Sequence, residues 1–370
     1  MRLLDRYLLR ELLIPLGYCL CGFLIFWVAF DLFAELNNFQ EHKLHGGDIL
    51  EYYLVKTPEF LVIVMPMGLL LALLYTLTNH ARHHEITAIR GAGVSMWRLC
   101  VPYLGVGLAA SICLFALNEF WVPSTSDLAE KIMNRRVQRP KPAGVATSGL
   151  ANQRERRTWL AGEYDPRTSE MLNPQVLWIL PDGSEMWLLA SRAIRTSGVW
   201  TFFNARQYTA APDTNSMLAP VVQTNVLAMP QFNETPEEIQ SEIDISRGMS
   251  LRGRNKADIP ISQILNYLRL HPQPADSLKP WLYTKLHGRL AMPWTCLVVV
   301  LVATPFGAAT GRRNVFVGVA SSIFICFVYF VLQQFGLALG TGGYVPAWLA
   351  AWFPNLAFGL AGLWMMSRIR

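Results

Sequence analysis

Charged residues are scarce in this chain of 370 residues, since Asp, Glu, Lys and Arg together make up 16% of it. A soluble protein carries closer to about a quarter, so much of this chain belongs in apolar surroundings. The sequence also has no Gly-Lys dipeptide, which excludes a phosphate-binding loop of the GxxxxGKS/T kind. The chain therefore does not hydrolyse ATP through such a loop.

Cysteine and histidine are too sparse in the polar middle of the chain to suggest catalysis there. That region has no cysteine and a single histidine, His271, which stands beside Pro272. An enzyme domain would need a nucleophile with its base, or a metal cluster. His83 and His84 are adjacent and cannot both face one metal on a helix, so we expect no metal site. The cysteines lie in or beside apolar runs, where we interpret them as small apolar residues: Cys19, Cys21, Cys100, Cys113, Cys296 and Cys326.

Long apolar runs are what the sequence has in abundance. A helix of about 20 apolar residues crosses the hydrocarbon core of a membrane. The first run is too long for the core of a signal peptide and no small-residue cleavage site closes it, so we expect a retained helix. The sequence predicts six spans, at Leu12–Phe30, Phe60–Leu77, Leu99–Leu117, Leu290–Ala309, Val315–Leu339 and Val345–Met366.

Lysine and arginine beside the short loops predict which way the spans face. In the first loop, which lies on the opposite side of the membrane from the N-terminus, acidic residues outnumber Lys43 and Lys56. We therefore expect both termini in the cytoplasm and the middle domain outside, in the periplasm of a Gram-negative cell. The net charge of +6 then belongs to a membrane protein and not to a nucleic-acid binder. The predicted cytoplasmic side collects Arg2, Arg6, Arg10, Arg82, Arg90, Arg98, Arg312, Arg313, Arg368 and Arg370.

Short strands separated by turn sequences fill residues 158–227. Val176–Leu180 and Glu185–Ala190 flank the strong turn sequence Pro-Asp-Gly-Ser at positions 181–184 and predict a hairpin. Further strands are expected at Val199–Ala205 and Val221–Leu227. Repeated short strands with turns between them are typical of an all-β sandwich or roll.

Two helices are expected after the strands. Thr235 can cap a helix whose first position is Pro236, and Glu238 completes a capping box. Ile261–Leu270 predicts a second short helix that stops before Pro272. This helix leads the chain back to the membrane.

The predicted spans lack charges in their cores, where ion-driven transporters usually keep ionisable groups. Energy for transport is then expected from a partner, and the best docking candidate is the polar segment 79–93 between the second and third spans. Glu85 and Ile89 are four apart and share a helix face, with Arg82 close by. The alternative is a solvated connector in which Glu85 pairs with Arg82 and has no further role.

Several short sequence patches stand in a characteristic order and spacing: Leu4-Asp5-Arg6-Tyr7, EITAIRGAGVS at 85–95, KLHGRLAMP at 285–293, VATPFG at 302–307 and Pro354-Asn355. Taken together, they resemble the LptF/LptG family of permeases, also called the YjgP/YjgQ family. The resemblance covers nearly the whole chain, and the short tail after Met366 favours the LptG-like member.

The resemblance implies a polytopic α-helical membrane protein with three transmembrane helices on each side of an inserted periplasmic β-jellyroll domain. Residues 1–121 then hold the first three helices and a cytoplasmic coupling helix at about 80–93, residues 122–282 the jellyroll, and residues 283–370 the last three helices. Such permeases pair as one LptF-like and one LptG-like subunit on a dimeric cytoplasmic ATPase, LptB. The complex extracts lipopolysaccharide from the inner membrane and passes it to periplasmic bridge proteins of the LptC and LptA type.

In this family a glutamate of the coupling helix enters a groove on the ATPase, and by motif match that residue is Glu85. The resemblance implies an ATPase-coupling set of Glu85, Arg82, Ile86, Ile89 and Arg90. The chain itself is expected to bind no cofactor, because ATP is used by the partner subunit.

The substrate contacts are less direct, because family members often carry basic residues near the outer end of the first span, where this chain has Asp31 and Glu35. Phosphate recognition then falls to the paired subunit or to Arg135, Arg136 and Arg139. Two other classes stay open: a permease of another ABC-type lipid or lipoprotein export system, and a membrane-anchored sensor or enzyme whose outer domain acts.

Overall fold

The computed structural model of the chain folds into two units. The first comprises Met1–Val137 together with Asp276–Arg370, and the second comprises Gln138–Ala275. The residues that the structure describes are 3–136, 150–152, 156–160, 162–165, 168–196, 198–210, 221–249, 259–272, 274–308 and 315–368.

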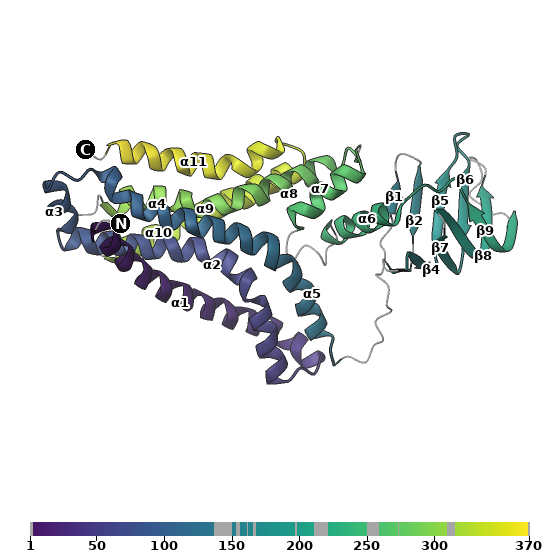
Figure 1. Cartoon of the computed structure of the whole chain (residues 1–370), viewed down its shortest axis with the longest axis horizontal. Helices are drawn as coiled ribbons and strands as arrows, with labels where there is room; N and C mark the ends of the chain where they lie inside the picture. The colour runs from purple at the N-terminus through teal and green to yellow at the C-terminus, as the bar shows by residue number, and fades with distance from the viewer. Residues whose placement is uncertain are drawn as a thin grey trace. The chain divides into compact units, whose positions relative to one another are not determined.

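The first unit is a bundle of helices (Figure 1). Six helical stretches of the described chain are long and apolar enough to cross a membrane, and each predicted span lies largely within one of them. The elements are α1 (Leu3–Glu41), α2 (Gly46–Arg82), α3 (Glu85–Gly91), α4 (Met96–Ala116), a π-helical turn (Leu117–Trp121), α5 (Val122–Met133), α8 (Lys279–Ala291), a 3₁₀ turn (Met292–Trp294), α9 (Thr295–Ala308), α10 (Val315–Thr341) and α11 (Ala347–Arg368).

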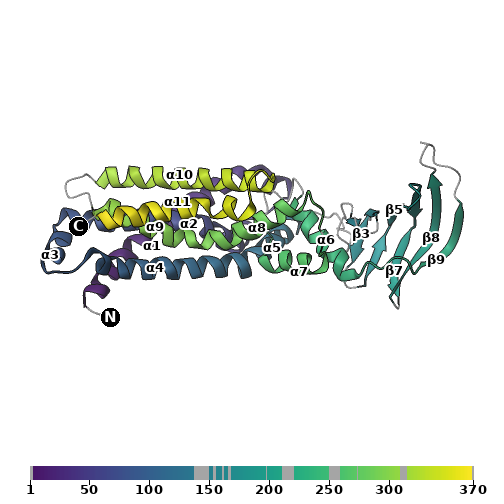
Figure 2. The same ribbon diagram turned by 90° about the horizontal axis from the view of Figure 1, so that it is seen from above.

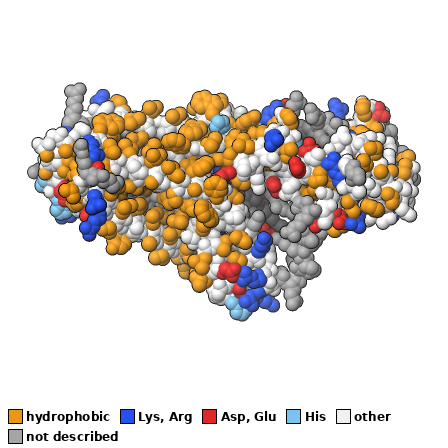
Figure 3. Space-filling model, viewed as in Figure 1, with side chains coloured by type: hydrophobic (Ala, Val, Ile, Leu, Met, Phe, Trp, Pro, Cys, Tyr) orange, Lys and Arg blue, Asp and Glu red, His pale blue; other side chains and the backbone are white. Residues whose placement is uncertain are grey.

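Helix α2 lies at the centre of the bundle because it is apolar all round. It packs against α1, α5, α9 and α10, and Val64, Leu69 and Leu73 are fully buried. The apolar stretches of α1 and α10 are instead mostly exposed. Figure 3 shows hydrophobic side chains covering the bundle, with charged ones gathered towards its ends. An apolar surface of this extent requires lipid or another membrane chain around it.

Both termini and α3 lie at the same end of the bundle (Figures 1 and 2). Arg82 at the end of α2, Arg98 at the start of α4 and Arg368 at the end of α11 belong to this end. The arginines that predict the orientation therefore gather together wherever the structure describes them. Arg2, Arg312, Arg313 and Arg370 lie outside the described residues.

The helices α1 and α2 are longer than a membrane requires. The 39 residues of α1 span about 58 Å, against a hydrocarbon core of about 30 Å. Their far ends form a cluster with α5, in which Phe39, Tyr52, Tyr53 and Phe60 pack around Ile132. Helix α5 is thus part of the helical unit, so the unit boundaries at 137/138 and 275/276 lie away from the expected ones at 121/122 and 282/283.

The Asn355 side chain of α11 hydrogen-bonds to the chain where α8 gives way to α9. Pro293 falls in the 3₁₀ turn between α8 and α9, where the Thr295 amide donates to Met292 O and so leaves the carbonyl of Ala291 without its helical partner. The Asn355 side chain donates to that carbonyl at 2.7 Å and accepts from the Tyr329 hydroxyl at 2.6 Å. Membrane helices tolerate proline where a neighbour satisfies the freed backbone group in this way.

Replacing Asn355 with leucine is expected to destabilise the bundle by about 1–3 kcal/mol, because it leaves a buried carbonyl and a buried hydroxyl short of one partner each. The measurement is thermal unfolding of the purified full chain in detergent. Leu356→Ala is the matched control, since Leu356 is the next residue and is exposed. Equal melting of the two variants would show that these hydrogen bonds do not stabilise the bundle.

The described residues of the second unit form one nine-stranded antiparallel sheet that curls (Figure 2). Two helices follow it, α6 (Pro236–Met249) and α7 (Ile261–Leu270). The strands are β1 (Leu150–Asn152), β2 (Arg157–Leu160), β3 (Glu163–Asp165), β4 (Glu170–Leu172), β5 (Gln175–Ile179), β6 (Glu185–Leu189), β7 (Arg192–Thr196), β8 (Val199–Ala210) and β9 (Val222–Met229).

The strand pairing of the sheet centres on β8, its longest strand. Strands β6 and β7 pair end to end with the two halves of β8, and β9 pairs along most of it. Asn173, between β4 and β5, and Asn204, within β8, have φ values of 49° and 51°, a left-handed conformation that asparagine tolerates. The Asn173 amide donates to Ser191 O, next to the start of β7. The result is a half-barrel, which corresponds to the predicted roll and not to a two-layer sandwich.

One face of the curled sheet carries the core of this unit. Trp159, Trp200 and Phe202 of the sheet are buried against Phe232 and against Ile239 of α6. A buried ion pair closes the cluster, because Arg157 donates to both carboxylate oxygens of Glu234 at 3.2 Å. The guanidinium also lies 4.5 Å from the centre of the Trp178 ring and 4.6 Å from that of Phe232, which is within the range of cation–π attraction.

The local predictions for this unit are confirmed where the structure describes them. Strands β5 and β6 form the expected hairpin. The predicted capping box is present, with the Thr235 amide donating to Glu238 at 2.7 Å and the Glu238 amide donating to the Thr235 hydroxyl at 3.2 Å. Helix α7 has the predicted bounds, Ile261–Leu270.

Candidate functional site

The segment between α2 and α4 folds as a short helix set apart from α2. Helix α2 ends at Arg82, and His84 adopts a left-handed conformation with φ 58°, which stops the helix. The seven residues of α3 follow, and Gly93, with φ 83°, donates its amide to Arg90 O at the far end. The expected single helix at about 80–93 is therefore two pieces, because the left-handed residue interrupts it.

The Glu85 carboxylate faces the bundle from the first position of α3. The Tyr7 hydroxyl of α1 donates to Glu85 Oε2 at 2.9 Å, and His80 Nδ1 of α2 lies 2.6 Å from the same oxygen. The Glu85 side chain keeps 33% of its surface exposed, whereas that of His80 keeps 2%. The carboxylate is thus held on one side and open to solvent on the other.

The other residues expected to couple an ATPase surround Glu85 in different environments. Ile86 is buried and Ile89 is half-buried, so these two attach α3 to the bundle. Arg82 and Arg90 are exposed. Arg82 makes no bond to Glu85, whose partners are Tyr7 and His80, so the simple pairing of Glu85 with Arg82 is wrong.

This arrangement is suited to docking. The partly exposed Glu85 carboxylate can accept charge-assisted hydrogen bonds from a partner, and the exposed guanidinium groups of Arg82 and Arg90 can donate them. Within the described ranges, no group of three His, Cys, Asp or Glu residues could hold a metal ion.

A second charged region lies at the opposite end of the bundle, where Arg135 and Arg136 follow α5. Arg135 donates to both oxygens of Glu51 at 2.8 Å, and Arg136 Nε donates to Asp48 at 2.7 Å. These contacts tie the end of α5 to the first turns of α2. The arginines remain partly exposed, at 48% and 41%, so a further anion can approach them. Arg139 lies outside the described residues.

The acidic residues near the outer end of the first span are also paired. Lys56 of α2 donates to both oxygens of Asp31, at 3.0 and 3.1 Å, and the Tyr53 hydroxyl donates to Asp31 at 3.2 Å. Glu35 accepts from the Asn38 side chain. The fold thus brings a basic residue to this region, because Lys56 of α2 lies beside Asp31.

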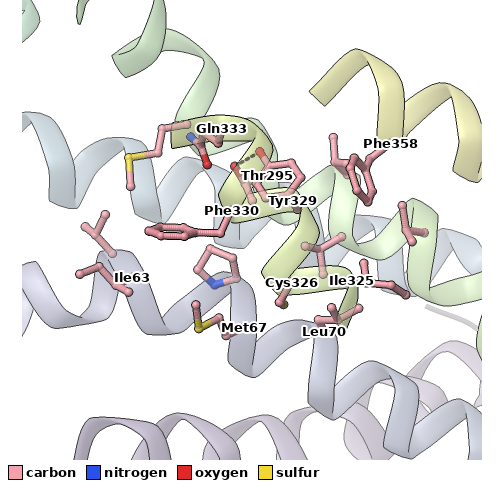
Figure 4. Close-up of a pocket in the computed structure, with 16 residues that line it drawn as sticks. Ile63, Met67, Leu70, Thr295, Ile325, Cys326, Tyr329, Phe330, Gln333 and Phe358 are labelled. Atoms are coloured by element: carbon pink, nitrogen blue, oxygen red, sulfur yellow. Dashed lines mark hydrogen bonds between the residues drawn. The ribbon is translucent and has the colours of Figure 1, made fainter. Parts of the chain in front are cut away.

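An apolar pocket of about 90 Å³ lies among α2, α9, α10 and α11 (Figure 4). Met67, Leu70 and Phe330 point into it, and its polar groups are Gln333 and the hydrogen-bonded pair Thr295 and Tyr329, whose hydroxyl oxygens are 2.8 Å apart. The described lining has no charged side chain. Such a pocket suits an apolar group and not an ion.

His271, the single histidine of the middle domain, joins α6 to α7. Its ring stacks on Tyr267 at 4.4 Å between centroids, and its Nε2 lies 3.7 Å from a carboxylate oxygen of Glu242. Burial raises the pKa of Glu242, although Tyr267 and His271 oppose that rise. These contacts fasten two helices together, and the sequence offers no cysteine nearby that could act as a nucleophile.

Sequence reasoning missed Tyr7, His80 and Lys56 as parts of these sites. Tyr7 belongs to the patch Leu4-Asp5-Arg6-Tyr7, which was noted for its resemblance and given no role. Its partner Glu85 stands 78 residues further along the chain, so no local pattern joins the two. Lys56 was counted only as a loop charge.

A comparison with known protein families gives one match, to the family model described as Lipopolysaccharide export system permease LptF/LptG. The match covers residues 6–368, and so it spans both the helical unit and the sheet unit. No curated protein sequence matches the chain.

Proposed function

The chain belongs to the LptF/LptG family of lipopolysaccharide export permeases, and from this premise we propose that it works as one half of the membrane part of an ABC transporter. Family membership and six membrane-spanning helices make it a multi-pass inner-membrane protein and a transport subunit. The proposal adds a second permease of the same family, a dimeric cytoplasmic ATPase of the LptB type and periplasmic bridge proteins of the LptC and LptA type.

The observation that carries the proposal is the position of Glu85. It stands on a short helix at the end of the bundle that holds both termini, with one edge of its carboxylate open. A rigid helix end with an exposed acceptor suits the groove of a partner that supplies arginine or backbone donors. In this proposal Arg82, Arg90 and the half-buried Ile89 complete the docking face, Ile86 anchors it, and the partner uses the ATP.

The exposed apolar faces of α1 and α10 support pairing with a second permease. Phe26 and Phe33 of α1 and Phe324 and Phe327 of α10 are all more than half exposed. We place the end with α3 in the cytoplasm and the sheet unit in the periplasm, following the arginines. There the apolar side chains of a curled sheet would shelter acyl chains from water as the lipid moves to the bridge.

For the substrate, we propose that phosphate groups approach Arg135 and Arg136, with Arg139 three residues further along the chain. Both described guanidinium groups keep an exposed edge, although Asp48 and Glu51 already accept from them. A phosphate would have to share or displace these carboxylates. Asp31 then acts on the lipid through Lys56, whose charge it holds in place, whereas Glu35 is paired with Asn38.

The experiment that tests this proposal is affinity purification of the tagged chain from its native membranes in mild detergent, with mass spectrometry of bound proteins and lipids. A second six-span permease, a small ATPase and lipopolysaccharide are expected in stoichiometric amounts. The partner's sequence will then tell whether this chain is the LptF-like or the LptG-like subunit. Recovery of the chain alone, or with a partner that has no ATPase, would contradict the energy-coupling part of the proposal.

A further inference from the structure

We infer that the start of α1 supports the ATPase contact from the bundle side. Tyr7 of α1 and His80 of α2 act as positioning residues, which hold Glu85 in the orientation in which it meets the ATPase. The inference rests on the proposed function, since it concerns how a docked ATPase moves the bundle. It gives a role to the patch Leu4-Asp5-Arg6-Tyr7, which neither the spans nor the docking face explains.

The two contacts to Glu85 fall on the same carboxylate oxygen. Tyr7 donates to Oε2 at 2.9 Å, and His80 Nδ1 lies 2.6 Å from Oε2. The other oxygen, Oε1, has no hydrogen-bond partner within the described chain. The carboxylate is therefore oriented, with Oε2 turned to the bundle and Oε1 available to a donor from outside. One residue can then bond to a partner and to two transmembrane helices at once.

The His80 ring is placed where Glu85 is its main polar contact. Its side chain is 2% exposed, its centroid is 5.7 Å from that of Tyr7, and its buried Nε2 has no hydrogen-bond partner among the described residues. Buried polar groups are normally hydrogen-bonded. Among the described residues, Nδ1 is the ring nitrogen of His80 that has a partner, so its contact with Glu85 orients the ring. A displacement of Glu85 must disturb both His80 and Tyr7.

The start of α1 also forms a salt bridge with the chain beyond α3. Asp5 lies 2.8 Å from the Arg98 guanidinium, and the Ser95 hydroxyl accepts from the Arg98 amide to cap α4. Two residues of α1 that stand two positions apart thus hold the chain at the first residue of α3, Glu85, and beyond its end, at Arg98. A force applied to α3 is passed directly to α1, α2 and α4, three of the membrane-spanning helices.

The test uses the full chain with the ATPase and permease that purify with it, reconstituted in vesicles that contain lipopolysaccharide. Tyr7→Phe removes only the hydroxyl that donates to Glu85, and Tyr18→Phe makes the same change at an exposed position of the same helix. The Tyr7 variant is expected to keep its ATPase bound while lipopolysaccharide released per ATP falls about ten-fold, the factor that loss of a hydrogen bond to a charged group brings. Tyr18→Phe should leave both unchanged.

A second pair of variants separates hydrogen bonding from packing. His80→Asn keeps a donor near the Nδ1 position and should recover most of the export that His80→Leu loses. Hydrogen exchange of the α3 amides, measured on the purified chain without ATPase, should be several-fold faster in Tyr7→Phe than in Tyr18→Phe. This readout does not depend on transport.

The outcomes distinguish the inference from the proposed function. The inference is overturned if Tyr7→Phe matches Tyr18→Phe in export and in exchange, or if His80→Asn and His80→Leu export equally. It is also overturned if Tyr7→Phe releases the ATPase, because Tyr7 would then serve docking alone. The coupling role of α3 itself fails only if Glu85→Ala keeps both the ATPase and export.

Discussion

The Glu85→Ala chain is expected to insert and fold normally and yet to export no lipopolysaccharide. The substitution removes the exposed acceptor edge and both contacts to the bundle, at Tyr7 and His80. Hydrogen bonds to charged groups contribute about 1.5–3 kcal/mol each, so losing several together costs the coupling contact most of its strength. The measurements are co-purification of the ATPase and the rate of lipopolysaccharide release from reconstituted vesicles.

The matched control for this prediction is Thr87→Ala, an exposed position two residues further along α3. It should behave as the unmodified chain does in both assays. Glu85→Gln keeps the size of the side chain and one acceptor, so it should retain part of the export that Glu85→Ala loses. Normal export by Glu85→Ala would remove α3 from the coupling mechanism.

Replacing Trp200 with alanine is expected to unfold the sheet unit while leaving the helical bundle inserted. Trp200 is fully buried, its centroid is 5.5 Å from that of Trp159, and its indole donates to Glu234 O at 2.9 Å. Removing a buried tryptophan costs about 3–5 kcal/mol, a large part of the stability of a domain this size. Hydrogen exchange of residues 157–249 in the full chain should rise towards unfolded rates.

The control for the tryptophan is Trp187→Ala, which makes the same change on the opposite face of the sheet. Trp187 lies between the buried residues Met186 and Leu188 along β6 and is itself only half-buried. Its loss should leave the sheet folded and most amides protected. Full protection in Trp200→Ala would mean that the curled sheet does not depend on its aromatic core.

Local signals in the sequence predicted much of the fold correctly. Apolar runs of membrane length lie within the six helical stretches, because length and hydropathy are properties of neighbouring residues. The turn at 181–184 predicted the hairpin of β5 and β6, and Thr235 with Glu238 predicted the start of α6. Each of these features depends on residues close together in the chain, so a single sequence is enough to find it.

The candidate sites could be predicted only in part, because their contacts join distant residues. Glu85 was found through a family resemblance, but its partner Tyr7 lies on another helix. Arg135 was expected to meet phosphate, and the structure pairs it with Glu51, 84 residues earlier. The left-handed conformations of Asn204 within β8 and of Asn173 between β4 and β5 are also not predicted, because they depend on how distant strands pair in the sheet.

The central place of α2 has a consequence for how the protein is made. Its packing partner α9 begins at Thr295, long after α2 ends at Arg82. A ribosome that adds about 5–20 residues per second needs on the order of ten seconds or more to synthesise the intervening chain. During that time α2 stays in lipid, which solvates its apolar side chains as well as a neighbouring helix does. The first half of the protein can therefore wait in the membrane for the second without aggregating, and assembly of the bundle is a late, post-insertion event.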